Sequence, residues 1–213
     1  MTELITLDSV HRRYRLRAET VHAVNDVSLS LRSGTVTGLV GPSGSGKTTL
    51  INLVLGWEQP DEGTITRDPT ITDDWHSIAV IPQALGLLAE LSLSENVGLP
   101  ARLGNPEDQT PHALLAALGL DGLDDRLPDE ASLGEQQRTA VARALATDPR
   151  VLVADEPTSH QDEANVDIVA QMLRQAAVEG AAVFMATHDD RLLMIADAVH
   201  HIENGSITDP GRP

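Results

Sequence analysis

The chain has 213 residues, no cysteine, and 32 acidic against 15 basic side chains, which gives a formal net charge of −17. Such a charge opposes non-specific binding to DNA, RNA or anionic lipid, so we expect no nucleic-acid partner. The absence of cysteine excludes disulfides and thiolate zinc sites. Because no run of about 18 apolar residues occurs, we expect a soluble, cytoplasmic protein that reaches a membrane only through a partner.

The first predicted elements are antiparallel strands. Residues 4–9 alternate, and Val24, Val27, Leu29 and Leu31 continue the period expected of strands. The apolar run at 34–40 then predicts a buried strand. It leads into a glycine-rich stretch, after which residues 50–55 predict a helix.

Helices and strands alternate through the rest of the chain. Strands are predicted at 63–66 and 77–83, and a polar, helical insertion at about 90–130 contains a helix with Thr110 as N-cap and Pro111 at its first position. Later elements are a helix from about Gly134, a strand at 151–154, a helix at 165–178, a strand at 182–186, a helix at 191–196 and a hairpin at Asn204-Gly205. This βαβ alternation predicts an α/β fold with a mainly parallel sheet.

The glycine-rich stretch from Gly41 to Thr48 fits the phosphate-loop pattern GxxxxGK[ST] and stands between a predicted strand and a predicted helix. Glycines let backbone amides converge on an anion, Lys47 adds a charge for the terminal phosphates, and the Thr48 hydroxyl is a natural Mg²⁺ ligand. The sequence therefore predicts ATP-type nucleotide binding with Mg²⁺. The residues expected to bind it are Gly41, Pro42, Ser43, Gly44, Ser45, Gly46, Lys47, Thr48 and Thr49.

An acidic pair, Asp155-Glu156, ends the apolar run that begins at Val151. Adjacent residues at a strand tip point in different directions, so the two carboxylates can divide the work. Asp155 would orient the Mg²⁺ or its water, and Glu156 would act as general base toward the attacking water. Without a phosphate loop, such a pair would more often simply begin a loop.

With these motifs and the segment ASLGEQQR at 131–138, the sequence resembles the ATP-binding subunit of an ABC transporter over nearly the whole chain. The short segments VADEPT and EQQR are similar to those of the lipoprotein-releasing, macrolide-exporting and cell-division subgroup. The resemblance implies a single domain over 1–213, built as a P-loop NTPase core with an N-terminal antiparallel β subdomain and a helical subdomain at about 84–146. It also implies ATP hydrolysis that drives a permease, pairing with a second ATPase subunit, and a place on the inner face of the cell membrane.

The resemblance also assigns single residues. It implies that Tyr14 stacks on adenine, that Gln83 contacts the Mg²⁺ and the attacking water, and that His188 contacts the γ-phosphate. Asp162 corresponds to the aspartate of the D-loop. The implied metal ligands are Thr48, Gln83 and Asp155, and the implied catalytic residues are Glu156, His188 and Gln83.

The segment Ser132-Leu133-Gly134-Glu135 aligns with the family signature LSGGQ, which closes over the ATP of a second subunit. Leu133 replaces a glycine, so its backbone must either keep φ negative or carry a strain of about 1 to 2 kcal/mol. A side chain that points toward the partner's phosphate would hinder closure, whereas one that points away would cost little. Two alternatives follow: either Leu133 is tolerated, or it slows hydrolysis.

Two other functions remain open at this stage. One is a non-transport ABC-type ATPase that works as a nucleotide-gated interaction module, although the single motif set and the acidic charge disfavour it. The other is a P-loop kinase, for which Gln83, His188 and the signature-like segment would be coincidences. A neighbouring gene for a multi-span permease would favour transport.

Overall fold

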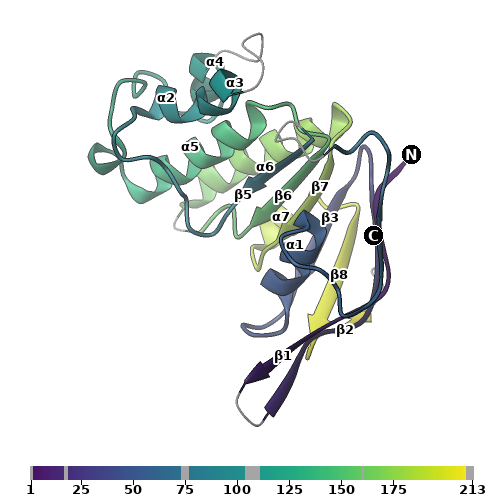
Figure 1. The fold of residues 1–213 in the computed structure, drawn as a ribbon. Helices are drawn as coiled ribbons and strands as arrows, with labels where there is room; N and C mark the ends of the chain where they lie inside the picture. The colour runs from purple at the N-terminus through teal and green to yellow at the C-terminus, as the bar shows by residue number, and fades with distance from the viewer. Residues whose placement is uncertain (1, 17–18, 73–76, 104–110, 160, 210–213) are drawn as a thin grey trace.

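A computed structural model of the protein describes residues 2–16, 19–72, 77–103, 111–159 and 161–209. These residues form two β-sheets with helices packed around them, as Figure 1 shows. The predicted α/β class with a mainly parallel sheet is confirmed. Thr110, the predicted N-cap, lies outside the described residues. The three longest described helices are α1 (Lys47–Leu55), α5 (Leu133–Leu145) and α6 (Glu163–Val178).

The smaller sheet has three antiparallel strands in the order β2-β1-β4. They are β1 (Glu3–Leu16), β2 (Glu19–Arg32) and β4 (Glu62–Arg67). The alternation predicted for residues 4–9 is interrupted, because the β1–β2 register shifts between Glu3 and Ile5 and the adjacent side chains of Leu4 and Ile5 are both buried. A local bulge of this kind breaks the two-residue period that a regular strand follows.

The larger sheet has six strands in the order β5-β6-β7-β3-β8-β9, and its last strand pairs antiparallel with its neighbour. Its strands are β3 (Val36–Val40), β5 (Ile78–Ile81), β6 (Val151–Asp155), β7 (Ala182–Ala186), β8 (Ala198–Glu203) and β9 (Ser206–Asp209). The predicted hairpin is confirmed, with φ of 49° at Asn204 and 81° at Gly205. Strand β5 ends at Ile81, so Gln83 follows the strand instead of ending it.

Both faces are covered at the centre of the larger sheet, which explains why β6 and β7 are apolar along almost their whole length. In β6, Val151 and Val153 pack in one cluster with α1 and the antiparallel sheet, whereas Leu152 and Ala154 pack in another with α5 and α6. Helix α1 therefore lies between the two sheets, and α5 and α6 cover the opposite face (Figure 1). The site lies where these layers meet.

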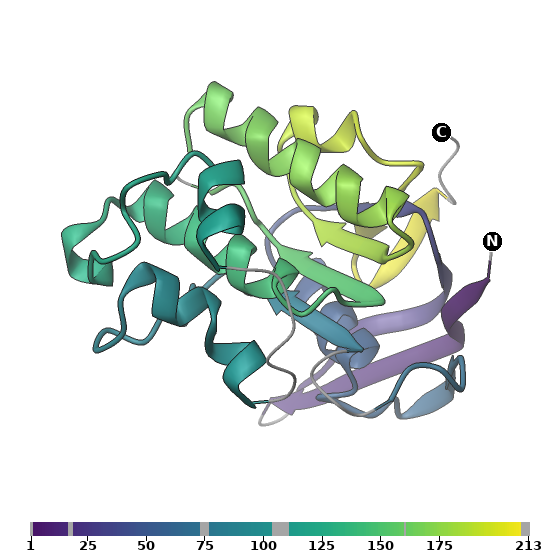
Figure 2. The ribbon, with the colours of Figure 1, turned by 90° about the horizontal axis from the view of Figure 1, so that it is seen from above.

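Short helices connect β5 to β6 along the chain and lie to one side of the larger sheet, as Figure 1 and Figure 2 show. They are α2 (Leu93–Val97), α3 (Leu99–Leu103), α4 (Pro111–Ala117) and the 3-10 helix η1 (Pro128–Glu130). Leu93, Leu115 and Val141 share one buried cluster, so α2 and α4 pack against α5. None of the helices in the described ranges is long and apolar enough to span a membrane.

The last helix is shorter than the sequence predicts. Helix α7 (Asp190–Leu193) ends well before Ala196, the predicted end. The reason lies at Asp197, whose backbone amide donates to the Val36 carbonyl oxygen at 2.8 Å and whose carboxylate accepts from the Val36 amide at 2.8 Å. These bonds bring the chain into register with β3, so the helix has to stop before them.

Candidate functional site

The glycine-rich loop joins the carboxyl end of β3 to the first turn of α1, as its sequence predicts. Gly46 precedes α1 with φ of 109°, and a Cβ there would lie 2.1 Å from the Ala23 carbonyl oxygen. A Cβ on Gly41 would lie 2.2 Å from the Ile202 carbonyl oxygen. Only glycine fits at these two positions. The free amides at the start of α1 carry the partial positive charge that attracts an anion.

Hydrogen bonds from the β8–β9 turn and from Lys47 fix the shape of the glycine-rich loop. The amide of Gly205, in the β8–β9 turn, donates to the Ser45 carbonyl oxygen at 2.9 Å. Lys47 Nζ donates to the carbonyl oxygens of Gly41 at 2.6 Å and Pro42 at 3.1 Å. Ser45 Oγ is buried and has no hydrogen-bond partner in the described part of the chain. The loop therefore holds an ammonium group, which suits a ligand rich in acceptor oxygens.

A cleft of about 380 Å³ lies in front of the loop. The predicted residues that line it are Tyr14, Ser43, Gly44, Gly46, Lys47, Thr48, Thr49, Gln83, Asp155 and Glu156. Val21 and Ala23 of β2 also line it, and sequence reasoning missed them because neither side chain has distinctive chemistry. A larger hollow of about 630 Å³ lies between the two sheets and contains none of the predicted residues. We therefore place the site in the smaller cleft.

Tyr14 lies at one end of the cleft in a network of side chains. Its hydroxyl donates to the Glu58 carboxylate, which also accepts from Arg12 Nε at 2.9 Å and Asn52 Nδ2 at 3.1 Å. The Arg12 guanidinium lies 5.0 Å from the centroid of the Tyr14 ring. Partial burial alone would raise the pKa of Glu58. The hydrogen bonds from Tyr14, Asn52 and Arg12 together outweigh this effect, so the net shift of the pKa is downward. This charged glutamate fixes the tyrosine.

The acidic pair lies at the carboxyl end of β6. Burial raises the pKa of Asp155, the neighbouring Glu156 carboxylate raises it further, and Lys47 opposes both. Glu156 has a positive φ of 50°, which is uncommon for a residue with a Cβ, and its amide donates to the Ala186 carbonyl oxygen at 2.8 Å. The backbone of Glu156 is therefore held in a costly conformation by a contact with β7.

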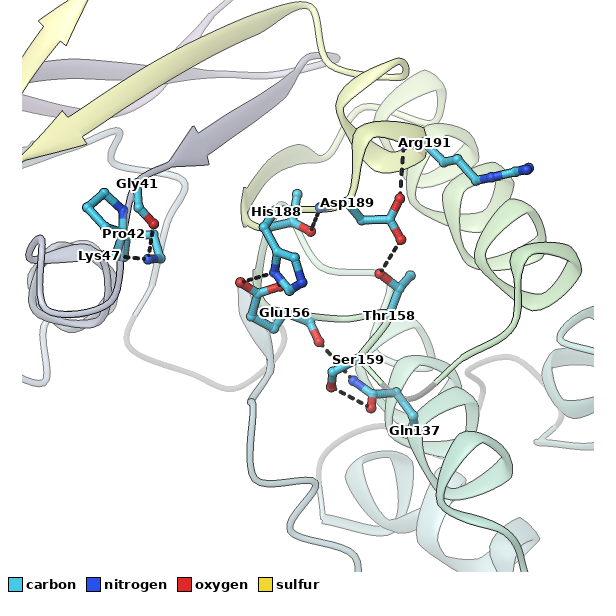
Figure 3. Close-up of polar contacts among 11 residues, drawn as sticks. Gly41, Pro42, Lys47, Gln137, Glu156, Thr158, Ser159, His188, Asp189 and Arg191 are labelled. Carbon is cyan, nitrogen blue, oxygen red and sulfur yellow. Dashed lines mark hydrogen bonds and ion pairs between the residues drawn. The ribbon is translucent and has the colours of Figure 1, made fainter.

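His188 follows β7, and Figure 3 shows its ring beside the Glu156 carboxylate. Its Nδ1 lies 3.0 Å from one carboxylate oxygen and 2.9 Å from the other. The hydrogen bond and the negative charge of Glu156 raise the pKa of His188. The ring itself is largely open to solvent, with 82% of the side-chain surface exposed. The structure thus brings together two residues that sequence reasoning placed in one site.

Oxygen donors for a metal ion lie on the edge of the same cleft, supplied by Thr48, Gln83 and Asp155. Among the described residues, no group of three or more His, Asp or Glu side chains is arranged to hold a metal ion. Mg²⁺ commonly uses one or two protein ligands and takes the remainder from phosphates and water. The Asp155 carboxylate, destabilised by burial and by Glu156, would gain from a nearby cation. The donor set therefore fits Mg²⁺ that arrives with a nucleotide.

The signature-like segment lies outside the cleft lining. Ser132 caps α5: its Oγ accepts from the Glu135 amide at 3.3 Å, and the Glu135 carboxylate accepts from the Ser132 amide at 2.7 Å. Leu133 is the first helical residue, has no positive φ, and is 46% exposed. The substitution of glycine by leucine therefore carries no left-handed strain in this chain. Gly134 follows within the helix.

Asp162 is the N-cap of α6, where its carboxylate accepts from the Asn165 amide at 3.0 Å. Sequence reasoning gave no role to Gln137, which is buried and contacts both Glu156 and Ser159. Its signal would have been a glutamine on the buried face of an amphipathic helix, a position where an unpaired amide is costly. Gln137 therefore joins helix α5 to the loop after β6, and local sequence patterns do not identify this contact.

A strand, a glycine-rich loop ending in Lys-Thr at a helix start, and an acidic strand end beside it define a P-loop nucleoside triphosphatase. Comparison of the sequence with known families identifies which one. Residues 24–159 match the family described as ABC transporter, and the chain belongs to that family as an ATP-binding subunit.

Relatives of known name narrow the assignment. The chain is 36% identical to the lipoprotein-releasing system ATP-binding protein LolD of Gluconobacter oxydans, over 95% of this chain and 94% of LolD. It is 33% identical to the methionine import ATP-binding protein MetN 1 of Listeria monocytogenes, over 98% of this chain and 66% of MetN 1. It is 32% identical to the macrolide export ATP-binding/permease protein MacB of Mannheimia succiniciproducens, over 97% of this chain and 34% of MacB. The chain thus spans about a third of MacB, and the predicted subgroup of lipoprotein-releasing and macrolide-exporting subunits is confirmed.

Solved structures share the fold. A dimeric ATP-binding cassette in a post-hydrolysis state, bound to ADP and Pi, superimposes with a TM-score of 0.88 at 27% identity and covers 97% of both chains. A nucleotide-free cassette from an ABC transporter superimposes with a TM-score of 0.79 at 26% identity, over 99% of this chain and 92% of the other. These neighbours confirm the predicted cassette fold.

The pairing of His188 with Glu156 predicts a pH dependence. We expect NMR titration of the ring to give a pKa for His188 above the ordinary value of about 6.5, and the Glu156→Gln variant to bring it back down. Because the folded pKa is raised, the stabilisation from this pair is fully present below the unfolded pKa and is lost as the pH rises through the folded pKa. An unchanged His188 titration in Glu156→Gln would contradict the pairing.

Proposed function

We propose that this chain binds and hydrolyses ATP to drive a membrane permease, as one of two ATPase subunits on the inner face of the cell membrane. The observation that carries the proposal is one cleft that gathers the phosphate loop, Tyr14 and Glu156, with His188 bonded to Glu156. The name of MacB joins ATP binding to a permease, and the neighbouring cassette is dimeric, which supports both partners. The whole chain would act as one domain, with residues 84–146 as the helical subdomain that faces the permease.

Nucleotide binding would use both ends of the cleft. Tyr14, oriented by Glu58, would stack on the adenine, while Lys47 and the loop amides from Gly41 to Thr49 hold the phosphates. Lys47 Nζ lies against the loop carbonyls of Gly41 and Pro42, so its ammonium group is already held at the loop that would bind the phosphates.

Hydrolysis would proceed by attack of a water oxygen on the γ-phosphorus, with cleavage of the bond to the ADP oxygen. Glu156 would accept the proton of that water, and Gln83 would orient the water from the facing side. Nδ1 of His188 would donate to the Glu156 carboxylate, which leaves Nε2 to contact the γ-phosphate. Mg²⁺, held by Thr48, Gln83 and Asp155, would supply positive charge for the phosphate oxygens.

The second subunit would complete the site. Its segment Ser132-Leu133-Gly134-Glu135 would close over the γ-phosphate, with Asp162 near the shared interface. In the free chain the Ser132 hydroxyl and Glu135 are engaged with each other at the start of α5. Leu133 is exposed beside them, so its isobutyl group lies on the surface that the proposal assigns to the partner.

The assignment of Glu156 as general base is tested by Glu156→Gln. We expect the assembled transporter with this variant to bind ATP as the wild type does, because the phosphate loop is intact, but to lose turnover by about a hundredfold or more. Steady-state ATPase rates and equilibrium ATP binding provide the readout. Glu203→Gln, the same change at an exposed strand residue, is the matched control. Full hydrolysis in Glu156→Gln would exclude the assignment.

The role of Leu133 is tested by Leu133→Gly in the assembled transporter. Removal of the isobutyl group from the closing surface is expected to raise the steady-state rate, by roughly tenfold if about 1.4 kcal/mol of transition-state stabilisation is regained. Val178→Gly, which removes another exposed apolar side chain from a helix, controls for the loss of helix propensity. A rate equal to that of the wild type would mean that Leu133 is simply tolerated.

A further inference from the structure

Gln137 is a polar residue in the buried interface between α5 and the loop after β6. It is only 1% exposed, and both ends of its amide are engaged. Nε2 donates to the Glu156 carbonyl oxygen at 3.0 Å, and Oε1 accepts from Ser159 Oγ at 3.0 Å. Burial of an amide is favourable only when such partners are present. The side chain is therefore built into a specific polar contact.

The contact falls on Glu156, whose backbone conformation is strained. Glu156 has φ of 50°, so its conformation persists only where surrounding groups enforce it. Its amide donates to Ala186 of β7 at 2.8 Å, and its carbonyl oxygen accepts from Gln137 on the other side. Figure 3 shows the contact between Gln137 and the Glu156 carbonyl oxygen together with the His188 ring beside the carboxylate. The backbone of Glu156 is thus held by two elements, which sets the direction in which its side chain leaves the loop.

The same side chain ties this loop to the signature-like segment. Gln137 stands one helical turn after Leu133 on α5, and the helix between them is continuous. The next residue, Arg138, donates to Gln161 Oε1 at 3.0 Å, just ahead of Asp162. A continuous helix and a direct hydrogen bond therefore connect the first turn of α5 to the loop of Glu156.

We propose that Gln137 is a positioning residue that couples the signature segment of a subunit to the general base of the same subunit. When a second subunit's nucleotide engages residues 132–135, Gln137 holds the backbone of Glu156 in the conformation that aims its carboxylate at water. Each chain thereby links the nucleotide site of its partner, which its residues 132–135 close, to its own nucleotide site, which contains Glu156. This inference rests on the proposed roles of Glu156 and of residues 132–135.

The test uses the assembled transporter with Gln137→Met, which keeps the length of the side chain and removes both hydrogen bonds. We expect kcat to fall by roughly tenfold to a hundredfold, while the KM for ATP and the affinity for a fluorescent ATP analogue stay within about twofold. The Hill coefficient for ATP should fall toward 1, because the two sites lose their link. Gln136→Met is the matched control. The side-chain amide of Gln136 donates to the Ala131 carbonyl oxygen and contacts neither Glu156 nor Ser159.

Ser159→Ala supplies a second, gentler variant, because it removes one partner of Gln137 and leaves the bond to Glu156. A smaller fall in kcat at unchanged KM supports the proposal even where Gln137→Met is poorly folded. The proposal is overturned if both variants keep wild-type kcat and Hill coefficient. It is also overturned if ATP affinity and melting temperature fall in parallel with kcat in both variants, because that is the signature of a structural role.

Glu156→Gln, measured in parallel, distinguishes failure of the coupling role of Gln137 from failure of the proposed role of Glu156. If Glu156→Gln loses turnover while Gln137→Met and Ser159→Ala do not, only the coupling role of Gln137 fails. If Glu156→Gln hydrolyses ATP at the wild-type rate, the proposed function of Glu156 fails, and the positioning role fails with it.

Discussion

The parallel register of β6, β7 and β3 is the constraint on which the site depends. Ala186 of β7 pairs with Asp155 on one side and with Leu39 of β3 on the other, so the three strands end at the same level. Glu156, His188 and the phosphate loop all follow these strand ends. A parallel sheet covered on both faces leaves such an edge open to ligands, as α/β sheets generally do. The candidate site residues are therefore brought together by strand pairing, which for β3 and β7 joins segments more than 100 residues apart.

Local signals predicted the parts of this arrangement that local forces determine. The phosphate loop needs glycine because the backbone approaches Ala23 and Ile202, and the Asn204-Gly205 turn needs two positive φ angles, so both leave a signature in the sequence. Strands β6 and β7 are almost entirely apolar because both of their faces are buried. These elements could be placed from residue types alone.

Long-range contacts decided what the sequence could not show. Glu58 orients Tyr14 from 44 residues away, and nothing near either residue indicates the pair. Helix α7 ends early because Asp197 has to meet Val36, which lies 161 residues earlier. The conformation of Leu133 was open in the sequence for the same reason, and the structure places it at the start of α5 without left-handed strain. Residues that come together only through the fold leave no recognisable pattern in the sequence.

We expect the nucleotide to bind in the cleft that Tyr14 and Glu156 line, and not in the larger hollow between the sheets. Calorimetric titration of the full chain with ATP distinguishes the two places. We expect one ATP per chain, with binding weakened by Lys47→Ala and by Tyr14→Leu in the cleft and unchanged by Ser30→Ala in the larger hollow. Binding that is lost in Ser30→Ala and retained in Lys47→Ala would place the nucleotide in the hollow instead.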